Sequence, residues 1–245
     1  SYLDVDAWSR LVTQWTGPPV GVTQPRARTP VKNARVVGLA ADAGNAMDYV
    51  PTTLAVRAEQ IKLTDRVLSQ VVVSGTRMGE LWRLNTSAKE LSGAIELRPA
   101  VGNNPAQLYA RLTYLNIPPS AVADVESMLS EQPSSIPALD IVVNDLTLRG
   151  KKLGRLEIEA VNQAGAAPNS REWRLNKFNV TLPEATLTAK GDWAADATSA
   201  RRTQLNFVLD VRDSGQLLTR LGTPNAVRDG RGKLQGQVSW RGSPI

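Results

Sequence analysis

One pattern of apolar residues occurs twice in this chain, and it constrains the fold more than any other feature. Apolar and polar side chains alternate through residues 54–73, and the same alternation returns, at one constant offset, in residues 139–158. Each copy carries a one-residue slip of phase at the same place. After a short insertion, the string Trp-Arg-Leu-Asn at residues 82–85 returns at residues 173–176. A period of two is typical of half-buried β-strands, so the repeat predicts two related β units.

Strands joined by short turns are therefore expected through most of the chain. The expected strands are 53–63, 67–73, 81–87, 91–97, 108–115, 138–148, 153–160, 173–182, 185–193, 205–211 and 234–240. Helical spacing of apolar residues predicts helices over 4–15, 120–131 and 213–222. The phase slips predict a bulge or bend in each copy. Gly93, Gly191 and Gly236 lie inside expected strands, which indicates kinks or places where a neighbouring strand passes close.

The chain divides into four expected parts. Residues 1–50 combine a helix with a linker rich in Pro and Arg. Residues 51–118 form the first β-groove repeat, and residues 119–136 a helical connector. Residues 137–245 form the second β-groove repeat, which we expect to continue beyond this fragment.

Such a sheet would carry Leu, Ile, Val and Trp on one face and charged or polar side chains on the other. The expected short helices are too few to cover the apolar face. Either two sheets close on each other as a β-sandwich, or one long, curved antiparallel sheet forms an apolar groove shaped like a taco shell. The alternation alone favours the sandwich, because an open apolar face is costly unless a ligand occupies it.

The composition argues against catalysis. The chain has no His and no Cys, which removes the commonest general base, the commonest zinc ligand and every Ser-His or Cys-His arrangement. Acidic residues such as Asp140, Asp145, Glu157 and Glu159 occur in expected strands, where Glu157 and Glu159 share a face opposite the apolar residues. Further acidic residues near the strand ends show no metal-loop spacing; they are Asp192, Asp196, Asp210 and Asp213. We therefore expect no enzyme activity, no cofactor and no metal.

The net charge of +6 comes largely from a basic segment at residues 25–35. It is compatible with solubility or with attraction to anionic lipid headgroups, and no nucleic-acid-binding signature accompanies it. No apolar run approaches the length of a membrane span. A membrane anchor, if there is one, is expected outside these residues.

Several segments resemble the C-terminal AsmA-like region of YhdP-family proteins. They are residues 137–160, 172–176, 185–193 and 232–244, and the likeness extends back towards Thr53. The resemblance implies a periplasmic protein tethered to the inner membrane and built, as in TamB-type proteins, from repeating β-grooves. It also implies phospholipid transport between the inner and outer membranes and support of the outer-membrane permeability barrier. It shifts our expectation from the sandwich to the groove.

The expected ligand is phospholipid or another acyl-chain lipid, with envelope proteins as further partners. The groove-lining candidates are Leu54, Val56, Ile61, Leu63, Val71, Val73, Trp82, Leu84, Ile141, Val143, Leu146, Leu148, Leu156, Ile158, Trp173 and Leu175. For each of them, ordinary core packing is an equally good explanation. The alternative function is a structural or protein-interaction module that binds through its sheet edges or its basic loop.

Overall fold

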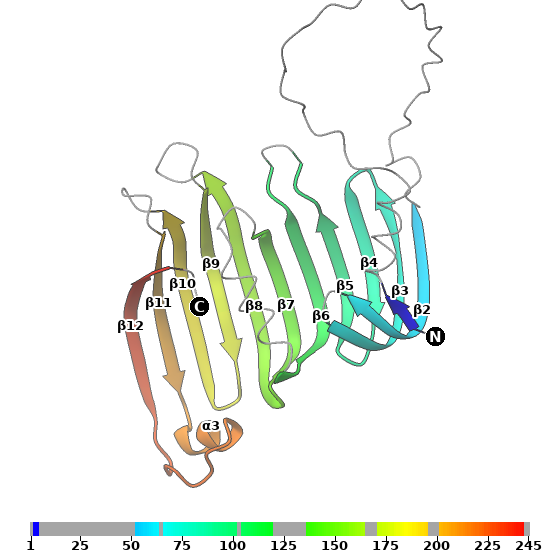
Figure 1. Cartoon of the computed structure of the whole chain (residues 1–245). Coiled ribbons are helices and arrows are strands. Elements are labelled where there is room, and N and C mark those ends of the chain that lie inside the picture. Colours follow the sequence, from blue (N-terminus) through cyan, green and yellow to red (C-terminus); the bar gives the residue numbers. More distant parts are fainter. Residues whose placement is uncertain are drawn as a thin grey trace, which may run out of the picture.

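The protein folds as one open, 12-stranded β-sheet whose strands follow one another in sequence order (Figure 1). The computed structural model describes residues 2–4, 52–63, 66–101, 104–119, 136–164, 171–195 and 201–242. The strands are β1 (Tyr2–Asp4), β2 (Thr53–Leu63), β3 (Arg66–Met78), β4 (Leu81–Ser87), β5 (Leu91–Arg98), β6 (Gln107–Ile117), β7 (Ala138–Leu148), β8 (Lys151–Ala164), β9 (Arg171–Thr181), β10 (Ala185–Ala195), β11 (Arg201–Val211) and β12 (Gly232–Arg241). The helix among the described residues is α3 (Ser214–Arg220).

The expectation of a single, mainly antiparallel sheet is confirmed, with two departures. β1 runs parallel to β2, and β6 runs parallel to β7. Both copies of the repeat therefore begin beside a parallel neighbour, at β2 and at β7. Among the described residues no second sheet faces the first, so the sandwich alternative is not what the chain forms.

The expected phase slips are present, but the two copies realise them differently. In the second copy the register between β7 and β8 shifts between Val143 and Leu146, as a bulge requires. In the first copy β2 and β3 keep one register, and Gln70 on β3 adopts a positive φ of 53°. Both strands of that pair therefore slip together. Either arrangement returns the next apolar side chain to the same face.

The buried side chains repeat with the sequence. Ala58, Ile61 and Val71 belong to one buried cluster near the β2 edge of the sheet. The equivalent positions of the second copy belong to a larger cluster over the middle of the sheet, which contains Ala110, Leu112, Val143, Leu146, Leu156, Val180 and Leu182. The two β units are therefore repeats in burial as well as in sequence.

One expected helix is confirmed and two cannot be compared. α3 falls within the expected helix at 213–222, where the Asp213 carboxylate accepts a hydrogen bond from the Gln216 amide and caps the first turn. The expected helix at 120–131 lies outside the described residues. So does most of that at 4–15, although Asp4 belongs to β1. In the described part of the chain, no helix is long and apolar enough to cross a membrane.

Candidate functional site: the apolar face of the sheet

The strand register joins apolar side chains of neighbouring strands into continuous rows on one face, which we call the apolar face. Residues directly opposite each other in adjacent strands point to the same side of a sheet. Successive partners therefore trace a row from β2 to β12. The first row contains Val56, Val73, Thr86, Gly93, Leu112, Val143, Leu156, Val180, Leu187, Leu209 and Leu234.

Two further rows run beside the first. The second contains Leu54, Gly75, Leu84, Ile95, Ala110, Ile141, Ile158, Phe178, Ala189, Phe207 and Gly236. The third contains Trp82, Leu97, Leu108, Leu139, Ala160, Leu175, Gly191, Leu205 and Val238. No charged residue interrupts any of the three rows.

These rows make the apolar face long as well as continuous. At a strand spacing of about 4.8 Å, the path from β2 to β12 is about 50 Å long. The main packing between described elements joins each strand to its immediate neighbours, and no described strand or helix lies across the rows. A surface of this size without a charged side chain is unusual for a side of a sheet that faces water.

The structure places ten of the sequence-predicted residues in the three rows. Val56, Val73, Val143 and Leu156 belong to the first row, Leu54, Leu84, Ile141 and Ile158 to the second, and Trp82 and Leu175 to the third. Val71 lies opposite Ala58, Ile61 opposite Leu68, Leu146 and Leu148 opposite Leu115 and Ile117, and Trp173 opposite Trp193. Leu63 lies opposite Arg66 in the backbone register, and its side chain is outside the described part. Whether these side chains contact lipid stays a prediction.

Several residues of the face were not among the predicted ones. They include Leu112, Val180, Phe178, Leu187, Phe207 and Leu209, which occupy the first two rows. The groove-lining candidates come only from the segments of the sequence that occur in both copies of the repeat. The same period-two alternation in β6, β9, β10 and β11 would have found the others.

Glycines let the strands of this face approach closely. A Cβ added to Gly93 would lie 2.2 Å from the carbonyl oxygen of Arg111, and one added to Gly191 would lie 2.2 Å from that of Gln204. For Gly236, the nearest atoms are those of the Phe207 ring, at 3.1 Å. The expectation that a neighbouring strand passes close to these glycines is confirmed.

An aromatic cluster with polar contacts ends the face where β7 begins. Trp173 and Trp193 lie opposite each other and are buried together with Ile136. The Trp173 indole N–H donates to the carbonyl of Pro137 at 3.0 Å, and the side-chain amide of Asn162 donates to Ile136 O at 2.9 Å. The buried indole N–H of Trp193 has no acceptor among the described residues. These contacts fix the chain segment that enters β7 against the sheet.

The opposite face, which we call the polar face, carries paired charges. Lys177 lies 2.7 Å from Glu157, and Arg155 donates to the same carboxylate at 2.8 Å. Hydrogen bonds from Lys177 and Arg155 hold the pKa of Glu157 below its usual range, and the Glu157 carboxylate raises the pKa of Lys177. Lys177 and Arg155 are exposed and Glu157 is only half-buried, so each pair contributes little to stability. The carboxylates of Glu157 and Glu159 thus have cationic partners on a face that is exposed to water.

The polar face also has a shallow hollow, and the arginines that line it already have acidic partners. It is lined in part by Arg111 and Arg155, near the bulge of β7. Arg111 pairs with Asp140 at 2.8 Å and lies over the Tyr109 ring, while Arg155 pairs with Glu157. Within the described residues, no group of three or more acidic side chains could hold a metal ion. The apolar face is thus the larger continuous feature.

An open β-sheet with one continuous apolar face defines the class of this protein. The chain belongs to the YhdP family, because the model of that family, described as YhdP protein, matches residues 1–245. No curated protein and no solved structure matches the chain.

Proposed function

We propose that the apolar face binds the acyl chains of phospholipid and lets them move along the sheet. The chain would then be a segment of a periplasmic protein, tethered to the inner membrane, that carries phospholipid between the inner and outer membranes and supports the outer-membrane permeability barrier. The unbroken rows of apolar side chains from β2 to β12 carry this proposal. Membership of the YhdP family supports it.

The physical basis is the hydrophobic effect, and no single residue is needed. Each methylene group of an acyl chain that leaves water for an apolar surface contributes about 0.8 kcal/mol. Along rows without charged interruptions, neighbouring positions offer similar binding energy, so a chain can shift from one to the next without a large barrier. The headgroup stays in water, where it keeps its hydration. The role proposed is one of binding and conduction, without a catalytic step.

Photo-crosslinking can test lipid contact at chosen positions. A photoreactive amino acid would be placed at Val73 or Ile158 on the apolar face, and the protein irradiated in cells and examined by mass spectrometry. Val72 and Glu159 are matched controls, because they are the chain neighbours of these residues and lie on the polar face, with Val72 41% exposed. We expect lipid adducts at Val73 and Ile158 at several times the control level. Equal or absent adducts at all four positions would refute the proposal.

A protein-interaction module is the second candidate, and the sheet edge favours it. Among the described residues β12 pairs with β11 alone, and its Leu234 and Val238 are 57% and 43% exposed. An uncovered edge strand with apolar side chains can add a strand from another protein. In the same irradiation experiment, a crosslinker at Val238 would then capture an envelope protein, while Val73 and Ile158 would capture no lipid.

A further inference from the structure

The segment between β11 and β12 folds back on itself and forms a unit at the ends of the strands, which we call the rim segment (residues 212–231). The amide of Ser214 donates to Gly230 O at 2.7 Å, which joins the start of α3 to the end of the following loop. Gly215 faces the carbonyl oxygen of Val227, only 2.8 Å from where a Cβ would be. Helix and loop are therefore ordered together.

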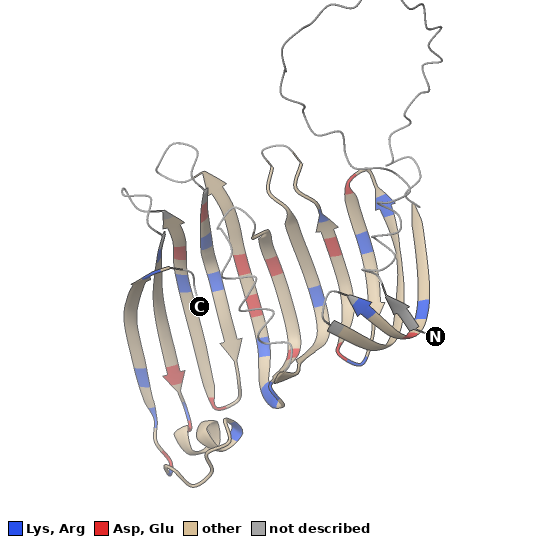
Figure 2. Cartoon of the chain, viewed as in Figure 1, with Lys and Arg blue, Asp and Glu red and all other residues tan. Residues whose placement is uncertain are grey.

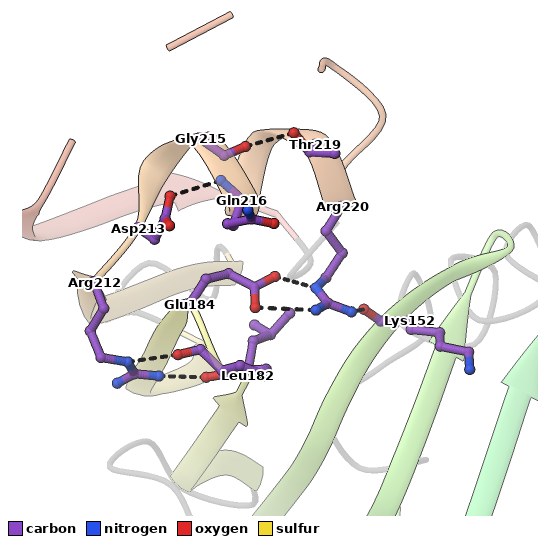
Figure 3. Close-up of polar contacts among 10 residues, drawn as sticks. Lys152, Leu182, Glu184, Arg212, Asp213, Gly215, Gln216, Thr219 and Arg220 are labelled. Atoms are coloured by element: carbon purple, nitrogen blue, oxygen red, sulfur yellow. Dashed lines mark hydrogen bonds and ion pairs between the residues drawn. The ribbon is translucent and has the colours of Figure 1, made fainter. Parts of the chain in front are cut away.

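Polar contacts hold the rim segment to the sheet (Figure 3). Arg220 on α3 pairs with Glu184 in the turn between β9 and β10, and Arg212 donates to Pro183 O at 2.9 Å. Lys151 donates from its ammonium group to Leu221 O at the end of α3. Lys151 lies opposite Leu148 in the register of β7 and β8. Because Leu148 lies on the apolar face, Lys151 reaches the rim segment from that side of the sheet.

Figure 2 shows both Lys or Arg and Asp or Glu at this end of the strands, and the basic residues outnumber the acidic ones in the rim segment and its surroundings. The cations of the rim segment, of the turn between β7 and β8 and of the start of β8 are Arg149, Lys151, Lys152, Arg212, Arg220, Arg228 and Arg231. The carboxylates of the rim segment and of the turn between β9 and β10 are Glu184, Asp213 and Asp229. Of these, Glu184 is neutralised by Arg220, and Asp213 caps α3. Cations are thus in clear excess here.

Two arginines of the rim segment form no ion pair with any described residue, and the same segment exposes apolar side chains. In the part of the chain that the structure describes, Arg228 and Arg231 form no ion pair or hydrogen bond, and both are exposed. Leu221 and Val227 of the same segment are 43% and 46% exposed. A segment that exposes both apolar side chains and unpaired guanidinium groups suits the boundary between the acyl chains and the phosphate of a phospholipid.

We propose that the rim segment binds the phosphate headgroup of a phospholipid whose acyl chains lie on the apolar face, and thereby selects anionic phospholipids. This inference rests on the proposed function, because it needs acyl chains on that face. A guanidinium group forms charge-assisted, paired hydrogen bonds to a phosphate, and the local excess of cations favours a lipid that carries a net negative charge. A zwitterionic headgroup would offset that attraction with its own ammonium group.

The test compares lipid uptake from mixed vesicles. Delipidated protein would be incubated with vesicles of equal parts phosphatidylglycerol and phosphatidylethanolamine with identical acyl chains, separated from them, and its bound lipid quantified by mass spectrometry. The rim variant is Arg228→Ser/Arg231→Ser. The control variant, Arg57→Ser/Lys190→Ser, removes the same charge from two exposed positions on the polar face.

The native protein and the control variant should both be enriched in phosphatidylglycerol. In the rim variant the enrichment should fall about fivefold or more, while the total bound lipid stays the same. Unchanged enrichment in the rim variant, or none in the native protein, overturns the inference and leaves the proposed function standing. Cosedimentation of the native protein with anionic vesicles without lipid uptake would show a membrane-docking surface instead, which also overturns it. If the native protein neither takes up lipid nor associates with vesicles, the proposed function fails as well.

Discussion

Glu184 in the turn between β9 and β10 accepts hydrogen bonds from two nitrogens of the Arg220 guanidinium group on α3. The Glu184 side chain is 5% exposed and that of Arg220 is 31% exposed. No residue of α3 is buried, so apolar packing contributes little to holding the helix. Polar contacts therefore hold α3 to the sheet, and the charge pair is the one among them that involves a buried carboxylate.

Replacing Glu184 by Gln should loosen the helix without unfolding the sheet. The variant keeps the shape of the side chain and removes its charge, so Arg220 loses a charge-assisted partner. We expect the free energy of unfolding to fall by about 1–2 kcal/mol. The amides of residues 214–222 should exchange with deuterium faster. Urea titration and hydrogen exchange measure the two effects.

Glu159→Gln is the matched control for this substitution. Glu159 also faces a cation, Lys177 at 3.5 Å, but its side chain is 53% exposed and lies on the polar face. Its replacement should change the free energy of unfolding by less than about 0.5 kcal/mol. If Glu184→Gln leaves the exchange of α3 unchanged, the charge pair does not hold the helix.

The contribution of this pair should disappear in acid. The hydrogen bond from Arg220 holds the pKa of Glu184 below its usual range, against the opposing effect of burial. Because the folded-state pKa is lowered, the pair contributes fully above the unfolded carboxyl pKa of about 4.3. Its contribution is lost as the pH falls through the lower, folded-state value. The gap in stability between native protein and Glu184→Gln should therefore close in acid, and denaturant titrations at a series of pH values would show it. A gap that stays constant would contradict this assignment.

Gly191→Ala should be strongly destabilising. The new Cβ would lie 2.2 Å from Gln204 O on β11, which is backbone and cannot rotate away, so β10 and β11 would have to separate. We expect a loss of about 3 kcal/mol in the free energy of unfolding. Gly232→Ala is the control, because nothing lies within 4 Å of that Cβ position. It should be neutral or stabilising by about 0.5 kcal/mol. Equal effects of the two substitutions would show that close strand approach is not the reason for Gly191.

The strands and their faces could be predicted from the sequence because burial on one side imposes a period of two. Val143 and Leu156 are an example, since their repeat equivalents Ala58 and Val71 share the same burial. The parallel pairing of β6 with β7 could not be predicted, because alternation carries no information on strand direction. Alternation also could not show that the register shifts between β7 and β8 but not between β2 and β3.

The rim segment was partly predictable. The helical spacing of apolar residues over 213–222 predicted α3. Its contact with the sheet depends on Glu184 in the turn between β9 and β10 and on Arg220 in the connection between β11 and β12, which are 36 residues apart in sequence. The apolar rows are continuous only because each strand pairs with its neighbour in the observed register. A one-residue shift in any strand pair would move its apolar side chains to the other face.

Neighbouring valines on opposite faces allow a direct test of which face is packed. Val71 is 1% exposed and Val143 is fully buried, whereas Val72 is 41% exposed on the polar face. Truncation to Ala removes two methyl groups from the packed face in the first two cases, so Val71→Ala and Val143→Ala should each cost about 2 kcal/mol of unfolding free energy. Val72→Ala should change it by less than about 0.5 kcal/mol. Urea titration of the three variants measures this difference. An equal loss of unfolding free energy at Val72 and Val71 would mean that side chains on the polar face are packed as tightly as those on the apolar face. The apolar face would then no longer be distinguished as the side of the sheet where acyl chains bind.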